Sequence, residues 1–123
     1  MRNISSFFVL FGMACSSDDG LKTYNDEPLA SITSHEDGDE IIEGQIVTFR
    51  GSVSDTNHRT EDLKAAWLVG SEVVCEYASP DEEGITTCDV LITSDVTEII
   101  LEAKDPNDAT DAASPKVIPQ RFL

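Results

Sequence analysis

Apolar and polar side chains alternate with a period of two along two neighbouring segments near the middle of the chain. In residues 44–53, one face is formed by Val47, Phe49, Gly51 and Val53. In residues 63–69, one face is formed by Leu63, Ala65, Trp67 and Val69. This period predicts two β-strands, each with one buried face. Trp67 is the only tryptophan, and we expect it to lie at the centre of the core.

Further short segments repeat this alternation and are separated by turns rich in Asp, Gly, Ser and Pro. The predicted strands cover residues 29–34, 44–53, 63–69, 72–77, 85–92, 96–104 and 112–123. Pro115 and Pro119 confine the last strand to a sheet edge, because proline has no N–H to donate. About seven short strands, with turns every ten residues or so, predict an all-β chain folded as an Ig-like antiparallel β-sandwich.

The first 27 residues have a different composition from the predicted sandwich. Arg2 precedes the apolar run 7–11, small residues follow, and Cys15 comes next. This order predicts a signal peptide over residues 1–14, too short to span a bilayer. It resembles the signal of bacterial lipoproteins, which implies that Cys15 is lipidated and anchors the protein to a membrane. Ordinary cleavage after Ala14 is the alternative.

Residues 15–27 then form a flexible acidic linker, and residues 28–123 form one domain.

The charge of the chain is strongly negative. It has 123 residues, with 8 basic and 24 acidic side chains, and a formal net charge of −16. Loss of Arg2 with the signal would leave seven basic and 24 acidic residues, a net charge of −17. A chain of this charge repels nucleic acid and anionic lipid headgroups, so we exclude both as binding partners.

The cysteines divide into one near the signal and two in the predicted domain. Cys75 and Cys88 fall on the apolar faces of successive predicted strands, and residues 79–84 form the turn between them. An antiparallel register would place the two cysteines opposite each other, and an exported protein would oxidise them to a disulfide. Two free core thiols are the alternative, and neither His35 nor His58 has the spacing of a metal ligand beside them.

Several short motifs occur in the order expected for one type of exported domain. They are the Asp37-Gly38 turn, Glu43-Gly44, a strand ending in residues 51–55, an acidic loop, and Leu63 followed by Trp67. Residues 99–105 followed by Asp108-Ala109 add a penultimate strand and its turn. Together these motifs resemble the bacterial Ig-like and PKD-like domains of exported surface proteins, over most of residues 29–111. The resemblance implies a binding, spacer or adhesive module without catalysis.

Acidic and amide side chains gather in two predicted loops. In an Ig-like sandwich, the loop after the second strand and the loop after the penultimate strand lie at the same end. These loops carry Asp55, Asn57, Glu61, Asp62, Asp105, Asn107, Asp108 and Asp111, and Asn25, Asp26 and Glu27 enter the domain there. Calcium prefers six to eight oxygen ligands, so these residues predict a calcium site between the loops. The alternative is that they are ordinary turn residues on an acidic surface.

The sequence contains no pattern that argues for a reaction. It has no nucleophile elbow, no HExxH motif and no phosphate-binding glycine loop, and we expect His35 and His58 to be solvated. We therefore expect a membrane-anchored extracytoplasmic module, at the cell surface, outer membrane or periplasm, that binds a protein or glycan or acts as a spacer. The alternatives are an accessory subunit whose last strand a partner completes, or a piece of a longer surface protein.

Overall fold

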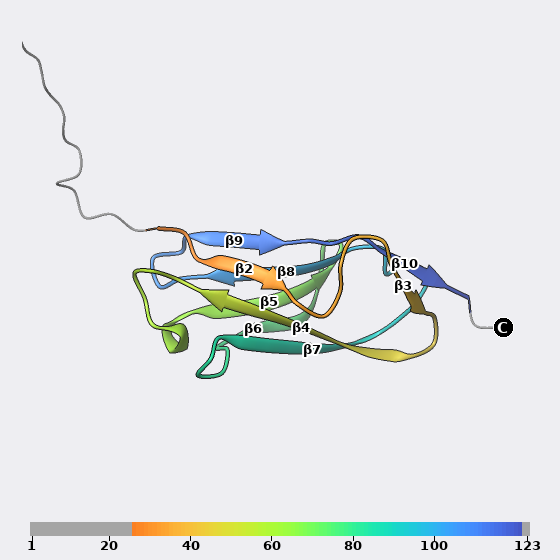
Figure 1. The fold of residues 1–123 in the computed structure, drawn as a ribbon, viewed down its shortest axis with the longest axis horizontal. Coiled ribbons are helices and arrows are strands. Elements are labelled where there is room, and N and C mark those ends of the chain that lie inside the picture. Colours follow the sequence, from red (N-terminus) through yellow and green to blue (C-terminus); the bar gives the residue numbers. More distant parts are fainter. Residues whose placement is uncertain (1–25, 122–123) are drawn as a thin grey trace, which may run out of the picture.

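The computed structural model describes residues 26–121, which form nine strands and a short 3-10 helix (Figure 1). The first four strands are β2 (Leu29–Ile32), β3 (Asp39–Ile42), β4 (Ile46–Ser54) and β5 (Lys64–Val69), and the 3-10 helix η2 (Thr60–Asp62) precedes β5. The others are β6 (Glu72–Ala78), β7 (Ile85–Leu91), β8 (Ile99–Lys104), β9 (Thr110–Ala113) and β10 (Val117–Gln120). Residues 1–25, with the predicted signal peptide, Cys15 and most of the linker, lie outside the described residues.

The strands form two antiparallel sheets packed face to face, as the alternating pattern predicted. One sheet has the order β2-β4-β7 and the other the order β6-β5-β8-β9. A third, two-stranded sheet pairs β3 with β10 in parallel. The described residues form nine strands where about seven were predicted, because β3 precedes the predicted strand of residues 44–53, and the last predicted segment contains the end of β9 and all of β10. Gly44, with φ +89°, turns the chain between β3 and β4, and the region of Pro115 separates β9 from β10.

The core lies between the two sheets and is centred on Trp67, as predicted. Trp67 is 1% exposed, and its ring centroid lies 6.4 Å from that of Phe49 on the opposite sheet. The other large, fully buried side chains are Leu63, Ile92, Ile99, Leu101 and Val53. Gly51 lies among them because no side chain fits: a Cβ there would lie 2.5 Å from Leu101 Cδ2 and 2.7 Å from the Ser31 carbonyl oxygen.

The disulfide between Cys75 and Cys88 is confirmed, but its predicted setting is wrong. The two cysteines do not face each other across a pair of adjacent strands, because β6 pairs with β5 and β7 pairs with β4. Residues 79–84 carry the chain from one sheet to the other, and Gly84 accepts a hydrogen bond from Val53 N–H on β4 (2.8 Å). The disulfide therefore joins the two sheets.

The sandwich has two long edges that are closed in different ways. At the paired edge, formed by β2, β3, β9 and β10, Ala30 N–H donates to Asp111 Oδ2 over 3.0 Å and β3 pairs with β10. At the bridged edge, formed by β6 and β7, the Cys75–Cys88 disulfide links two strands that belong to different sheets. Within residues 26–121, no helix is both long enough and apolar enough to cross a membrane.

Candidate functional site

The loops after β4 and after β8 meet at one end of the sandwich, as predicted (Figure 1). There, Asp55 Oδ2 lies 3.2 Å and Asp105 Oδ2 lies 3.9 Å from His58 Nδ1. The two aspartate side chains are fully buried and the histidine side chain is 18% exposed. The prediction that His58 is solvated was therefore wrong, because its ring fills the space between the two acidic loops.

Each aspartate of this cluster uses its second oxygen to shape its own loop. Asp55 Oδ1 accepts the N–H of Asn57 over 2.8 Å. Asp105 Oδ1 accepts the N–H groups of Asn107 (2.8 Å) and Ala109 (2.9 Å). The two loops are thus built alike, each folded around an aspartate that presents its other oxygen to the histidine. Turn formation, the alternative that the sequence left open, explains both residues.

The other residues predicted for a calcium site do not converge on this cluster. Asp111 binds Ala30 N–H, and Asn57 Oδ1 accepts Asp26 N–H over 2.6 Å. Asp62 is exposed and lies 3.9 Å from the Arg59 guanidinium. Asn107 and Asp108 are exposed, and Asp108 has φ +68° in the turn that Asp105 organises. Sequence reasoning also missed His58, although its position three residues after Asp55 in a turn was a usable signal.

The cluster of Asp55, His58 and Asp105 can hold the two loops together or supply part of a set of metal ligands. One ligand atom from each side chain lies within 4.8 Å of the others. Calcium needs six to eight oxygens, and this set offers two carboxylates and one imidazole. The hydrogen bond of His58 to Asp55 lies within one loop, and the 3.9 Å approach of His58 to Asp105 is the contact between the two loops. Calcium binding stays a prediction.

His35, the other histidine expected to be solvated, is also partly buried. Its ring centroid lies 4.5 Å from that of Phe49, and its Nδ1 lies 2.8 Å from Ser34 Oγ. The ring covers one side of a core phenylalanine, so packing explains its position and no second site is needed.

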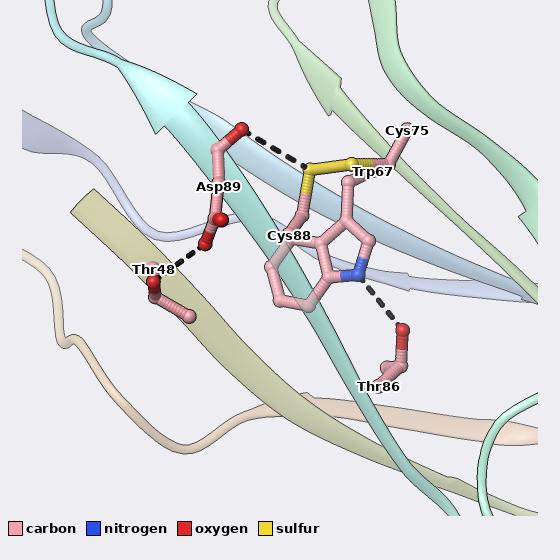
Figure 2. Close-up of a disulfide and its surroundings, with 6 residues drawn as sticks. All are labelled: Thr48, Trp67, Cys75, Thr86, Cys88 and Asp89. Carbon is pink, nitrogen blue, oxygen red and sulfur yellow. Dashed lines mark hydrogen bonds between the residues drawn. A yellow bond between two sulfur atoms is a disulfide. The ribbon is translucent and has the colours of Figure 1, made fainter. Parts of the chain in front are cut away.

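The bridged edge is the other feature that stands out from an ordinary sandwich surface. Trp67 Nε1 donates to Thr86 Oγ1 on β7 over 3.0 Å, so the tryptophan and the disulfide both connect the two sheets there (Figure 2). Beside the disulfide lies a groove of about 310 Å³. Its lining contains the apolar residues Val69, Val74, Val90, Leu91 and Val96 and the acids Glu72, Asp89 and Asp95.

Tyr77 on β6 covers part of the outer face of the same sheet. Its ring lies 4.5 Å from Lys104 Nζ, and its hydroxyl bonds to Glu102, so the side chain reaches across β5 to β8. Ala66 lies on β5 opposite Glu102 and is only 1% exposed. Partial burial, and then the bond to and charge of Glu102, raise the pKa of Tyr77 to about 12.

The fold is an Ig-like β-sandwich, and solved structures of Ig-like and fibronectin(III)-like domains are similar to it. The fibronectin(III)-like modules of Clostridium thermocellum CbhA match 81% of this chain with a TM-score of 0.61 and 14% identity, and the chain spans 50% of that structure. The titin I-band fragment I67-I69 matches 78% of this chain with a TM-score of 0.57 and 17% identity, and 33% of that chain is covered. A chimeric titin Z1Z2 matches 81% with a TM-score of 0.55 and 13% identity, over 100% of that chain. Identities this low establish the fold alone.

No protein-family model and no curated protein sequence matches the chain.

Proposed function

We propose that this chain is an exported, lipid-anchored module that binds or spaces other components and has no catalytic activity. The observation that carries the proposal is the disulfide between Cys75 and Cys88, which joins the two sheets of a small Ig-like sandwich. Disulfides of this structural kind persist in oxidising compartments, so the bridge favours an extracytoplasmic location. The signal-like residues 1–14 and the cysteine that follows them support the same location.

A labelled fatty acid supplied to cells that express the full chain tests the anchor. The wild type is expected to incorporate label and to fractionate with membranes, whereas Cys15→Ala is expected to do neither. The matched control is the double variant Cys75→Ala/Cys88→Ala, which loses two cysteines but keeps Cys15 and should still be labelled. Equal labelling of the wild type and Cys15→Ala contradicts lipidation, and an unlabelled, secreted wild type favours cleavage after Ala14.

The accessory-subunit alternative rested on a weak last strand that a partner would complete. Both halves of that segment have partners within the chain: β9 pairs with β8, and β10 pairs with β3. We therefore favour a self-contained module over one that needs a donated strand in that position.

Calcium binding at the loop end is retained as part of the proposal, and its support is the close approach of Asp55 and Asp105. Calorimetric titration with calcium tests it, with Asp55→Asn as the matched variant. The amide can still accept the Asn57 N–H and shape the turn, but it lacks the charge. Heat in the wild type that Asp55→Asn reduces would support the site. No heat and no rise in melting temperature at millimolar calcium would exclude it.

A further inference from the structure

The groove at the bridged edge is large enough for a few side chains of a polypeptide segment. Its volume of about 310 Å³ lies at the lower end of the range for ligand sites. It begins next to the disulfide, because Val74 precedes Cys75 and Asp89 follows Cys88, and both residues line it. The covalent link holds β6 and β7 at a fixed separation at that end, so the groove does not depend on a ligand to stay open.

Large apolar side chains are exposed at this groove and beside it. Val74 is 39% and Leu91 is 57% exposed, and both belong to the lining. Leu91 is the cross-strand partner of Ile46, which is 70% exposed. The apolar surface therefore continues from the groove onto the outer face of β4 and β7. Contiguous exposed apolar surface of this kind is typical of an interaction site.

The charge of the groove restricts what can bind there. Glu72, Asp89 and Asp95 are among its lining residues, and no basic residue of the described chain is. Thr48 Oγ1 donates to Asp89 Oδ1 over 2.5 Å and holds that carboxylate on the outer face of β7 (Figure 2). An apolar surface with acids at its rim favours a partner with both aliphatic and basic side chains.

The backbone favours an extended partner along β7. Within residues 26–121, β7 pairs only with β4 and its register is regular from Ile46↔Leu91 to Ser52↔Ile85. Its other edge has no strand partner, and only its first residue is capped there, because Ile85 N–H and carbonyl bond to Asp81. The pairing of β6 with β5, by contrast, has two register shifts, and bulges of this kind hinder strand addition. In the constant-type Ig sandwich a further strand occupies the position beside β7. Alternate side chains of an added strand would face the groove and the solvent.

We propose that the bridged edge binds an extended segment of a partner protein, in which aliphatic and basic side chains alternate, as an added strand along β7. The inference rests on the proposed function as a binding module and names the chemistry of its partner. The aliphatic side chains would enter the groove, and the basic ones would meet the acids at its rim.

Binding of synthetic nonapeptides to the purified full chain, followed by NMR chemical shifts and calorimetry, tests the proposal. A peptide of alternating lysine and valine is expected to bind and to shift the signals of β6 and β7. A lysine–glycine peptide should bind at least tenfold more weakly, because it lacks every aliphatic side chain and burial of even one contributes ~1.5 kcal/mol, about a factor of ten. A glutamate–valine peptide should not bind, and N-methylation of alternate residues of the lysine–valine peptide should abolish binding by blocking strand hydrogen bonds.

Variants of exposed residues locate the site without changing the core. Leu91→Asn and Asp95→Lys are each expected to weaken binding of the lysine–valine peptide about tenfold. The matched controls are Ile118→Asn, an apolar residue 46% exposed on β10, and Glu82→Lys in the turn before β7. Equal affinity for the lysine–valine and lysine–glycine peptides, or equal loss in the controls, would overturn the proposal in favour of general charge attraction. Fatty-acid labelling at Cys15 is measured separately from peptide binding. A labelled chain that does not bind the peptide contradicts the groove proposal alone, and an unlabelled chain that binds the peptide contradicts the lipid anchor alone.

Discussion

The paired edge and the bridged edge close the same sandwich by different means. At the paired edge, segments distant in sequence bond directly: Asp111 accepts the Ala30 N–H, the Lys116 carbonyl accepts the Gly38 N–H, and the Lys116 N–H donates to the Asp37 carboxylate. At the bridged edge, the disulfide joins β6 to β7 and the Trp67 side chain bonds β5 to β7, while exposed valine and leucine side chains lie beside them.

This difference shows how an edge of a small sandwich can be kept in place and still remain open. Hydrogen-bonded pairing uses the backbone groups of both strands, so the paired edge has fewer groups left for a partner. A disulfide stabilises mainly by restricting the unfolded chain and covers little surface. Because the disulfide stabilises the bridged edge, the unpaired edge of β7 and the apolar groove can remain exposed to solvent there.

Replacement of Trp67 by alanine should have the largest effect on stability. Trp67 is 1% exposed, and its removal leaves a cavity between the sheets, so we expect a loss of ~3–5 kcal/mol in the free energy of unfolding. Denaturant unfolding measures this loss. Trp67→Phe is the matched variant: it keeps most of the packing but loses the bond to Thr86, and should cost less than Trp67→Ala. A loss below ~1 kcal/mol for alanine would contradict the central role of this residue.

Removal of the disulfide should have the next largest effect and should act on the bridged edge. The loop between Cys75 and Cys88 spans a sequence separation of 13, so Cys75→Ala/Cys88→Ala should lower the free energy of unfolding by about 3 kcal/mol. Hydrogen exchange should rise in β6 and β7 before it rises in β2 and β9. Uniform acceleration in all four strands would mean that the disulfide stabilises the whole domain without holding one edge.

Asp111→Ala is the equivalent substitution at the paired edge and should give the opposite order of hydrogen exchange. The N–H of Ala30, which is 8% exposed, would lose a carboxylate acceptor, at a cost of about 2 kcal/mol. Hydrogen exchange should now rise first in β2 and β9, with β6 and β7 protected. Glu82→Ala, an exposed acid in a turn, is the control for loss of charge and should change stability little. If the two variants are equally stable, the Asp111 bond does not secure the paired edge.

Local pattern was sufficient to predict most of the strands and the buried faces of β4 and β5, whereas β6 is exposed along most of its length. The period of two identified Phe49, Gly51 and Val53 as core residues and Trp67 as its centre, because these properties depend on neighbours within a strand. The pattern could not show that β6 pairs with β5 and not with β7. Both arrangements bury Cys75 and Cys88 side by side, so the disulfide was predictable while its position between sheets was not.

The candidate sites depended on contacts between distant loops and were harder to predict. The common end of the two acidic loops followed from the fold class, and it brought Asp55 and Asp105 together. The sequence does not distinguish these two aspartates, which fold inward, from exposed Asp62 and Asp108 in the same loops. The groove was not predictable at all, because it depends on which strand edges stay unpaired once both sheets have formed.

Alkaline pH should weaken the bridged edge slightly, through Tyr77 on β6. The pKa of its hydroxyl is raised from 10.0 to about 12 in the folded chain, so the unfolded chain loses this proton at lower pH. The contribution is complete below pH 10 and disappears as the pH rises through about 12, so stability should fall across that window. The fall should be small, because Tyr77 is 39% exposed.

Ultraviolet absorbance of tyrosinate in a Tyr24→Phe background would isolate this group, and Glu102→Gln should bring its titration closer to that of free tyrosine. If Tyr77 in the Tyr24→Phe background titrates like free tyrosine, its side chain does not lie over β5 in contact with Glu102.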